Sequence, residues 1–184
     1  IAYAVSNKRT LVIGADLRRP RLYKDFNKSA KYGISNYLEN SKIKIEDIIL
    51  NSDDKNLDLI YSGYKPERPA ELFASDRFLE LIDKLKLLYD IIIIDTPPVG
   101  LVADALIISK SVDINLFVVR HKVSSKASLN FINELEKNNK FKNINIVFND
   151  VTSSDENHYG YGYGYGYVYH SKSATSNYFS DEKV

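Results

Sequence analysis

The amino-acid sequence predicts an α/β fold in which a mostly parallel β-sheet is flanked by helices. Through residues 1–150, short apolar runs alternate with charged, amphipathic stretches. Three of the runs are continuously apolar rather than alternating, which is typical of strands that are covered on both faces of a parallel sheet. Strands that alternate with helices in this way form right-handed crossover units.

Five segments have the composition of strands, and two longer segments have the periodicity of helices. The predicted strands are residues 10–14, 57–61, 90–95, 114–119 and 144–148. Residues 69–88 carry apolar side chains at every third or fourth position and begin at Pro69, which favours the first turn of a helix. A second helix is predicted over residues 125–138, with Ser124 or Ser125 as its N-cap.

The composition excludes several classes of protein. The 184 residues are 44% apolar and carry a formal net charge of +1, which suits a globular domain and gives no field that would attract nucleic acid. The absence of Cys excludes disulfides and thiolate chemistry. No apolar run exceeds five residues, which is far too short to cross a bilayer. Because the sequence contains no Met, we expect the chain to be a piece of a longer protein.

The composition changes near Asp150, where aliphatic residues become rare and Ser, Asn, Gly and Tyr become frequent. We therefore predict a globular domain over residues 1–150 and a flexible tail over residues 151–184, which lacks the apolar surface that offsets the entropy of ordering. Tyrosines at every second position alternate with glycines in this tail, and in an extended chain they would project to one side. They are Tyr159, Tyr161, Tyr163, Tyr165, Tyr167 and Tyr169.

Two of the predicted strands end in turns that carry aspartate. Asp95 directly follows residues 91–94, and Asp16 with Arg18 follows residues 10–14. Ligands of open α/β sheets bind at the carboxyl ends of the strands, where a carboxylate can hold Mg²⁺ or its waters beside a phosphate and an Arg can stabilise phosphate charge. The alternatives are that Asp95 caps the next loop and that the charges around Asp16 belong to a solvated loop.

The sequence resembles the bacterial tyrosine kinases that regulate capsule and exopolysaccharide assembly. Residues 10–20 resemble the second Walker-type motif of this family, and residues 91–98 resemble its Walker B motif. Residues 62–72 and 112–120 are similar to its connecting segments, so that with the tyrosine cluster the resemblance covers essentially the whole chain. Partitioning ATPases share the individual motifs, whereas the combination with a tyrosine cluster is much more specific.

The resemblance implies a P-loop NTPase-like scaffold that transfers the γ-phosphate of ATP to tyrosine. Asp95 would hold Mg²⁺ through water, and Asp16 would lie near the γ-phosphate as a second Mg²⁺ partner or as the base. Arg18 would bind phosphate, and Asn149, after the last strand, would contact the adenine. The phosphoacceptors would be the six tail tyrosines from Tyr159 to Tyr169.

The sequence departs from the family pattern at two places. Gly14 stands where the family usually has an aspartate. The motif therefore carries one of its two usual carboxylates, and the role of both is expected to fall to Asp16. No segment supplies the Gly-rich loop that ends in Lys-Ser/Thr, and residues 1–10 are typical of the end of the helix that follows such a loop. We therefore expect the chain to lack the first strand and the Walker A loop, and the 184-residue piece alone to be inactive.

The resemblance also implies partners and a location. The kinase would form a homo-oligomer, expected to be a ring, in which one subunit phosphorylates the tail of the next. It would lie at the cytoplasmic face of the bacterial inner membrane, through a polysaccharide chain-length regulator that is fused upstream or is a separate activator, and a tyrosine phosphatase would reverse the modification. Two alternatives remain open at the level of sequence: a partitioning or cell-division ATPase and a non-catalytic assembly scaffold, in which the Gly/Tyr segment would serve self-association.

Overall fold

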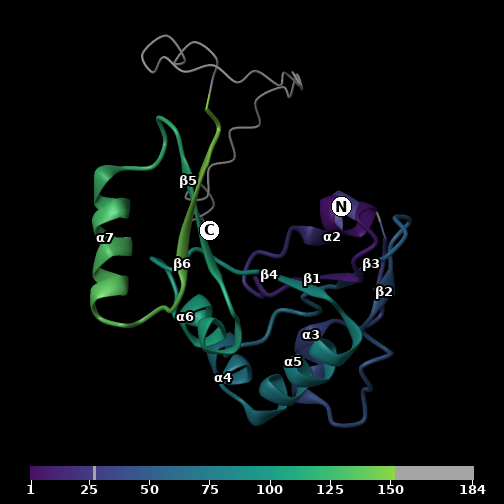
Figure 1. Ribbon diagram of the computed structural model, residues 1–184. Coiled ribbons are helices and arrows are strands. Elements are labelled where there is room, and N and C mark those ends of the chain that lie inside the picture. Colours follow the sequence, from purple (N-terminus) through teal and green to yellow (C-terminus); the bar gives the residue numbers. More distant parts are fainter. Residues whose placement is uncertain (27, 152–184) are drawn as a thin grey trace, which may run out of the picture. The chain divides into compact units, whose positions relative to one another are not determined.

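The computed structural model describes residues 1–26 and 28–151 (Figure 1). Ile1–Asn149 form one compact unit, and every helix and strand described below belongs to it. Of the second unit, Asp150–Val184, only the first two residues are described. The predicted tail with its six tyrosines therefore lies outside the described residues, apart from Val151.

The main sheet has four strands in the order β2-β3-β1-β4. β1 (Thr10–Gly14) lies at its centre and pairs in parallel with β3 (Leu57–Ile60) on one edge and with β4 (Ile91–Asp95) on the other. The two-residue β2 (Leu50–Asn51), which the sequence analysis did not predict, adds to β3 in the antiparallel sense. The predicted mostly parallel sheet is thus confirmed.

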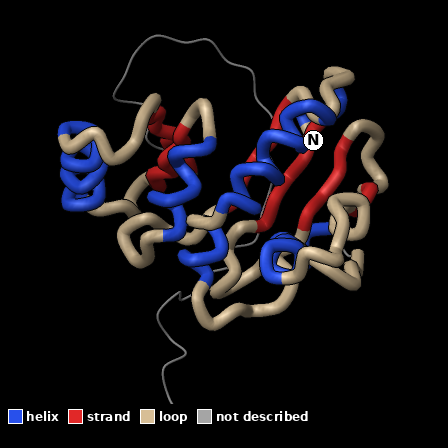
Figure 2. Tube along the Cα trace, turned by 90° about the horizontal axis from the view of Figure 1, so that it is seen from below, coloured by secondary structure: helices blue, strands red, loops and turns tan. Residues whose placement is uncertain are grey.

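A second sheet contains two parallel strands, β5 (Asn115–Arg120) and β6 (Ile144–Asn149). Figure 2 shows the strands in two separate groups. All five predicted strands are present, and each of their ends lies within one residue of the predicted position. The apolar runs were therefore sufficient to locate the described strands of both sheets except the two-residue β2.

Helices connect the strands, and several of them lie on one side of the main sheet (Figure 1). They are α1 (Ala2–Val5), α2 (Leu22–Phe26), α3 (Ile34–Glu39), α4 (Pro69–Phe73), α5 (Asp76–Leu88), α6 (Asp104–Ile108), the 3₁₀ helix η1 (Ser109–Ser111) and α7 (Lys126–Lys137). The prediction of α7 is confirmed, and its N-cap is Ser125, whose Oγ accepts a hydrogen bond from the backbone N–H of Ser128. The helix α1 agrees with the helical end predicted for residues 1–10.

The prediction of one helix over residues 69–88 is wrong, because the segment forms α4 and α5 with a break between them. Ser75 adopts an extended backbone there and caps α5, since its Oγ accepts from the N–H of Phe78 at 3.3 Å. The apolar pattern continues across the break, where Phe73 and Phe78 are both buried and their rings meet edge to face at 5.3 Å. Periodicity therefore could not reveal the break.

The core lies between the main sheet and the helices α3, α4 and α5. It includes the side chains of Leu11, Ile13, Ile34, Phe73, Phe78, Leu81 and Leu85, all at most 1% exposed. The expectation that continuously apolar strands are covered on both faces holds for β1 but is wrong for β4 and β5. In the described part of the chain nothing covers one face of these strands, and Ile93, Leu116 and Val118 are 42%, 64% and 61% exposed.

Arg77 on α5 forms hydrogen bonds with the C-terminal end of α3 and the segment after it. Its Nε donates to the carbonyl oxygen of Tyr37 at 2.7 Å, and its Nη2 donates to the carbonyl oxygens of Asn40 and Ile43 at 3.2 and 3.1 Å. The guanidinium also lies over the ring of Tyr37, 4.1 Å from its centroid. One side chain thus donates to a carbonyl of the last turn of α3, where the helix supplies no further donors, and to two carbonyls of the segment that follows.

We predict that Arg77→Met, which keeps the apolar stem but removes the donors, lowers the free energy of unfolding by about 2–3 kcal/mol. Urea denaturation followed by circular dichroism measures this change. The matched control is Arg68→Met, because the ion pair of Arg68 with Glu71 is exposed on both sides and its loss should change the free energy by less than about 0.5 kcal/mol. Equal effects of the two variants would contradict the assigned role of Arg77.

Candidate active site

The carboxyl ends of β1 and β4 meet at one edge of the main sheet. Gly14 pairs with Asp95 in the parallel register, and the N–H of Ala15 donates to the carbonyl oxygen of Asp95 at 2.7 Å. The chain beyond β1 is thereby attached to the tip of β4. Asp16 and Asp95, which lie far apart in the sequence, arrive at the same edge of the sheet as the sequence analysis expected.

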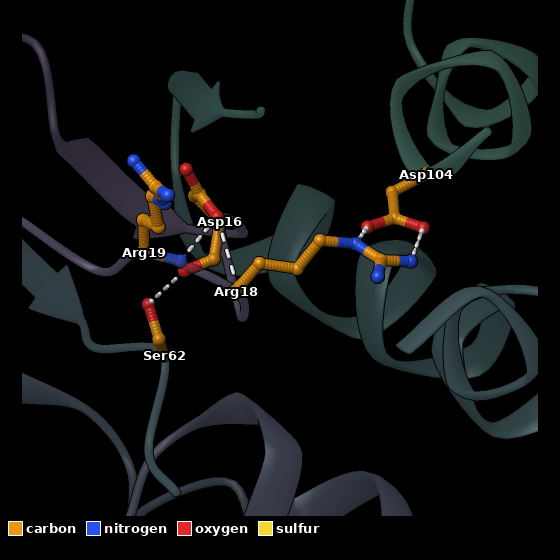
Figure 3. Close-up of polar contacts among 5 residues, drawn as sticks. All are labelled: Asp16, Arg18, Arg19, Ser62 and Asp104. Carbon is orange, nitrogen blue, oxygen red and sulfur yellow. Dashed lines mark hydrogen bonds and ion pairs between the residues drawn. The ribbon is translucent and has the colours of Figure 1, made fainter. Parts of the chain in front are cut away.

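A tight turn orients Asp16. Its Oδ1 accepts hydrogen bonds from the backbone N–H groups of Arg18 at 3.0 Å and Arg19 at 2.9 Å (Figure 3). Aspartate commonly forms such turns by bonding backbone groups two or three residues ahead. The half-buried carboxylate therefore has a defined direction, set by the loop that carries it.

Ser62 supports the same loop from the tip of β3. Its side chain is buried, and its Oγ donates to the carbonyl oxygen of Gly14 at 2.9 Å and lies 3.2 Å from that of Asp16. The sequence analysis placed Ser62 only in a connecting segment and did not identify this contact. A single serine after a strand gives no local indication that its partner lies at the end of a different strand.

Arg18 forms a two-pronged ion pair with Asp104, the first residue of α6. Its Nε lies 2.9 Å from Oδ2, and its Nη2 lies 3.2 Å from Oδ1 (Figure 3). The Arg18 side chain is 40% exposed and the Asp104 side chain is fully buried. The hydrogen bond to Asp104 raises the pKa of the Arg18 guanidinium above its ordinary value.

The partner of Arg18 is a finding that the sequence analysis missed. That analysis expected Arg18 to bind phosphate, and the structure places its guanidinium on Asp104. An acidic residue in the first turn of a helix is common and points to no particular partner. Which cation approaches Asp104 depends on how the loop after β1 lies against α6.

Gly14 occupies a confined space. Its backbone does not adopt the left-handed conformation that favours glycine. A Cβ atom placed on it would lie 3.2 Å from the Oγ of Ser62 and 3.3 Å from the Cδ2 of Leu22. The aspartate that the family usually carries here would therefore require both neighbours to move by a few tenths of an ångström. The glycine suits the close packing of this loop.

Asp16 and Asp95 form a set of donors that fits Mg²⁺. Asp95 is exposed and Asp16 is half-buried, and both offer carboxylate oxygens at the tips of neighbouring strands. In the described residues, no group of three or more acidic or His side chains gathers as a metal cage. Mg²⁺ is commonly held by one or two carboxylates while it keeps several waters and binds substrate phosphates, and these two residues suit that mode.

Asn149 belongs to a different part of the unit. It is the last residue of β6 in the two-stranded sheet, where its carbonyl oxygen accepts from the N–H of His121 at 2.9 Å. No strand pairing in the described residues joins β6 to β1 or β4. Its expected contact with adenine stays a prediction.

Comparisons with known proteins agree with these motifs. No family model matches the sequence. The chain is 39% identical over 118 residues to the tyrosine-protein kinase ptk of Acinetobacter johnsonii, which covers 64% of this chain and 16% of that protein. It is 32% identical over 160 residues to the tyrosine-protein kinase YwqD of Bacillus subtilis, which covers 87% of this chain and 67% of that protein. The chain spans only about a fifth of the length of the first curated relatives it matches.

Solved structures confirm the fold. The kinase domain of the Escherichia coli tyrosine kinase ETK superposes with a TM-score of 0.77 at 32% identity, over 88% of this chain and 63% of that one. The septum site-determining protein MinD of Pyrococcus horikoshii, solved with Mg-ADP, superposes with a TM-score of 0.63 at 21% identity, over 78% of this chain and 58% of that one. The second likeness shows the fold alone.

We predict that Ser62→Ala lowers the free energy of unfolding by about 1–2 kcal/mol, because it removes the hydroxyl that donates a buried hydrogen bond to the carbonyl oxygen of Gly14. Urea denaturation measures the change. The control is Ser6→Ala, because Ser6 is exposed and donates to the carbonyl oxygen of Ala2 within the first helix; its effect should stay below about 0.5 kcal/mol. A Ser62→Ala variant as stable as the original protein would show that this bond does not hold the loop.

Proposed function

The chain belongs to the bacterial tyrosine-protein kinase family, and we propose that it forms most of the ATP-dependent kinase domain of a protein-tyrosine kinase that acts in capsule or exopolysaccharide assembly. The observation that carries this proposal is the pairing of two strand tips. Gly14 at the end of β1 pairs with Asp95 at the end of β4, and Asp16 follows Gly14 by two residues. Relatives support the setting, since one is named a putative tyrosine-protein kinase in the cps region of Klebsiella pneumoniae.

In this proposal, Asp95 and Asp16 hold Mg²⁺ at the edge of the sheet. The bound Mg²⁺ and ATP supply the phosphoryl group and neutralise its charge during transfer. A tyrosine hydroxyl, with a pKa of about 10, is a poor nucleophile at neutral pH and needs a positioned base. In the alternative in which Asp95 alone holds Mg²⁺, Asp16, which its turn orients, is our candidate to accept that proton. Asn149 is our candidate for adenine contact.

The backbone amides that bind the phosphates are proposed to come from a segment before Ile1, because residues 1–184 contain no Gly-rich loop ending in Lys-Ser/Thr. Support comes from β4, which pairs only with β1 in the described part of the chain and leaves its other edge available to a strand. The exposed Ile93 of β4 and Leu116 of β5 offer apolar surface that such a segment would cover. By itself, the 184-residue chain is then inactive.

The proposed acceptors are the six tail tyrosines, Tyr159, Tyr161, Tyr163, Tyr165, Tyr167 and Tyr169, phosphorylated by a neighbouring subunit of a homo-oligomeric ring. Each phosphotyrosine adds a charge of about −1.5 to −2, so that the modified tails repel one another and favour disassembly. A tyrosine phosphatase would reverse this step. Glycines stand between most of these tyrosines, and residues without a Cβ atom would place few steric limits on entry into a neighbouring site.

We also propose that the domain works at the cytoplasmic face of the bacterial inner membrane. In the described residues, no helix combines the length and the apolarity needed to cross a bilayer. A polysaccharide chain-length regulator, fused upstream or bound as a separate activator, would provide the attachment. Relatives named CapB and a solved CapA2B2 chimera support an activator of this kind.

We predict that Asp95→Asn and Asp16→Asn, made in the full-length protein, each reduce autophosphorylation roughly 100-fold, because each removes a carboxylate from the Mg²⁺ site. Initial rates of ³²P incorporation at several Mg²⁺ concentrations measure the loss. Asp83→Asn, which changes an exposed acid on α5, is the control and should keep the original rate. Full activity of the first two variants would refute the assignment of the site.

We predict that replacing the six tyrosines with Phe abolishes the phosphate mass increments that intact-mass spectrometry detects after incubation with ATP and Mg²⁺. Mixing this variant with Asp95→Asn protein tests the direction of transfer, since only transfer between subunits can modify the tail of the inactive partner. A partitioning ATPase would not need the tyrosines, so an original protein that gains no phosphate on residues 159–169 would favour that alternative.

A further inference from the structure

The Arg18–Asp104 pair differs from the surface ion pairs of the protein. The carboxylate of Asp104 is fully buried and meets the guanidinium of Arg18 through two hydrogen bonds, at 2.9 and 3.2 Å. By contrast, the Arg9–Asp90 pair exposes 58% and 39% of its two side chains. A parallel, two-pronged contact fixes orientation as well as distance.

This pair joins the segments that follow the two strand tips. Arg18 binds Asp16 through its backbone N–H and Asp104 through its side chain (Figure 3). Asp104 opens α6, the first helix after Asp95. Arg18 therefore connects the carboxylate of Asp16 to α6, the helix that follows Asp95 in the chain.

A role in stability alone does not account for this arrangement. An ion pair with a buried member adds little net stability, because the cost of removing the buried charge, here that of Asp104, from water offsets much of the attraction. Such pairs are best attested where one particular geometry has to be specified. Here the specified element is a loop whose central carboxylate, Asp16, lies beside the tip of β4.

We propose that Asp104 is a positioning residue of the kinase site. Through the guanidinium of Arg18, it holds the Asp16 turn against the segment that follows Asp95. It thereby fixes the direction of the Asp16 carboxylate. This inference rests on the proposed function, because it concerns the Mg²⁺ site of the kinase. It gives Arg18 the role of a connector between two acids rather than that of a direct phosphate ligand.

The test uses Asp104→Asn, Arg18→Gln and the double variant of the full-length protein. Asn keeps the shape of Asp104 and removes its charge. Each single variant should lower the kcat of autophosphorylation about tenfold and raise the Mg²⁺ concentration for half-maximal rate several-fold, with a KM for ATP changed less than about twofold. The double variant should be no slower than the single variants, since both interrupt the same connection.

Two further variants make the test specific. Asp90→Asn removes the exposed Arg9 pair and should leave kcat and the Mg²⁺ requirement unchanged. Arg18→Lys keeps the positive charge next to Asp104 without the two-pronged geometry, and it should reproduce the loss of kcat in a protein whose thermal melting stays close to the original. This variant carries the test if Asp104→Asn does not fold.

The possible results separate the two proposals. An original protein that transfers no phosphate to tyrosine would overturn the proposed function and this inference with it. Normal transfer by the original protein together with unchanged kinetics of Asp104→Asn would overturn the inference alone. So would a raised KM for ATP in Arg18→Gln that Asp104→Asn does not share, because it would make Arg18 a direct ligand of the nucleotide.

Discussion

The parallel pairing of β1 with strands on both of its edges is the constraint on which the rest of the structure depends. Its buried residues Leu11 and Ile13 lie at the centre of the core, and its register sets Gly14 opposite Asp95. Parallel strands end at the same edge of a sheet, so this single register brings Asp16 to the tip of β4. Without it, the two acids would not lie at the same edge of the sheet.

The loop beyond β1 is held by contacts from three directions. Ser62 supports its backbone, Asp104 binds its arginine, and the N–H of Ala15 ties it to Asp95. Such support suits a site that works by electrostatics, because groups fixed before the reaction need no reorganisation during it. The close packing around Gly14 leaves little room for a side chain at that position. The carboxylate at the tip of β1 is therefore provided by Asp16.

The fold alone does not distinguish a kinase from a cell-division ATPase, since MinD shares it and one fold commonly serves unrelated functions. What separates them is the combination of the strand-tip acids with the row of tyrosines from Tyr159 to Tyr169. Family membership agrees with this combination. The proposed activity therefore rests on the site and its proposed substrate, and the fold accounts only for how the site is assembled.

The sequence by itself determined the five longer strands, the helix α7 and the two strand tips that carry Asp16 and Asp95, because these depend on short-range patterns of apolar and polar residues. Tertiary structure alone decided the break at Ser75, where the apolar pattern continues although the backbone turns. It alone also decided that Arg18 binds Asp104 and that Ser62 supports the Asp16 loop. Such partners are distant in the sequence and are chosen by packing, so no local pattern predicts them.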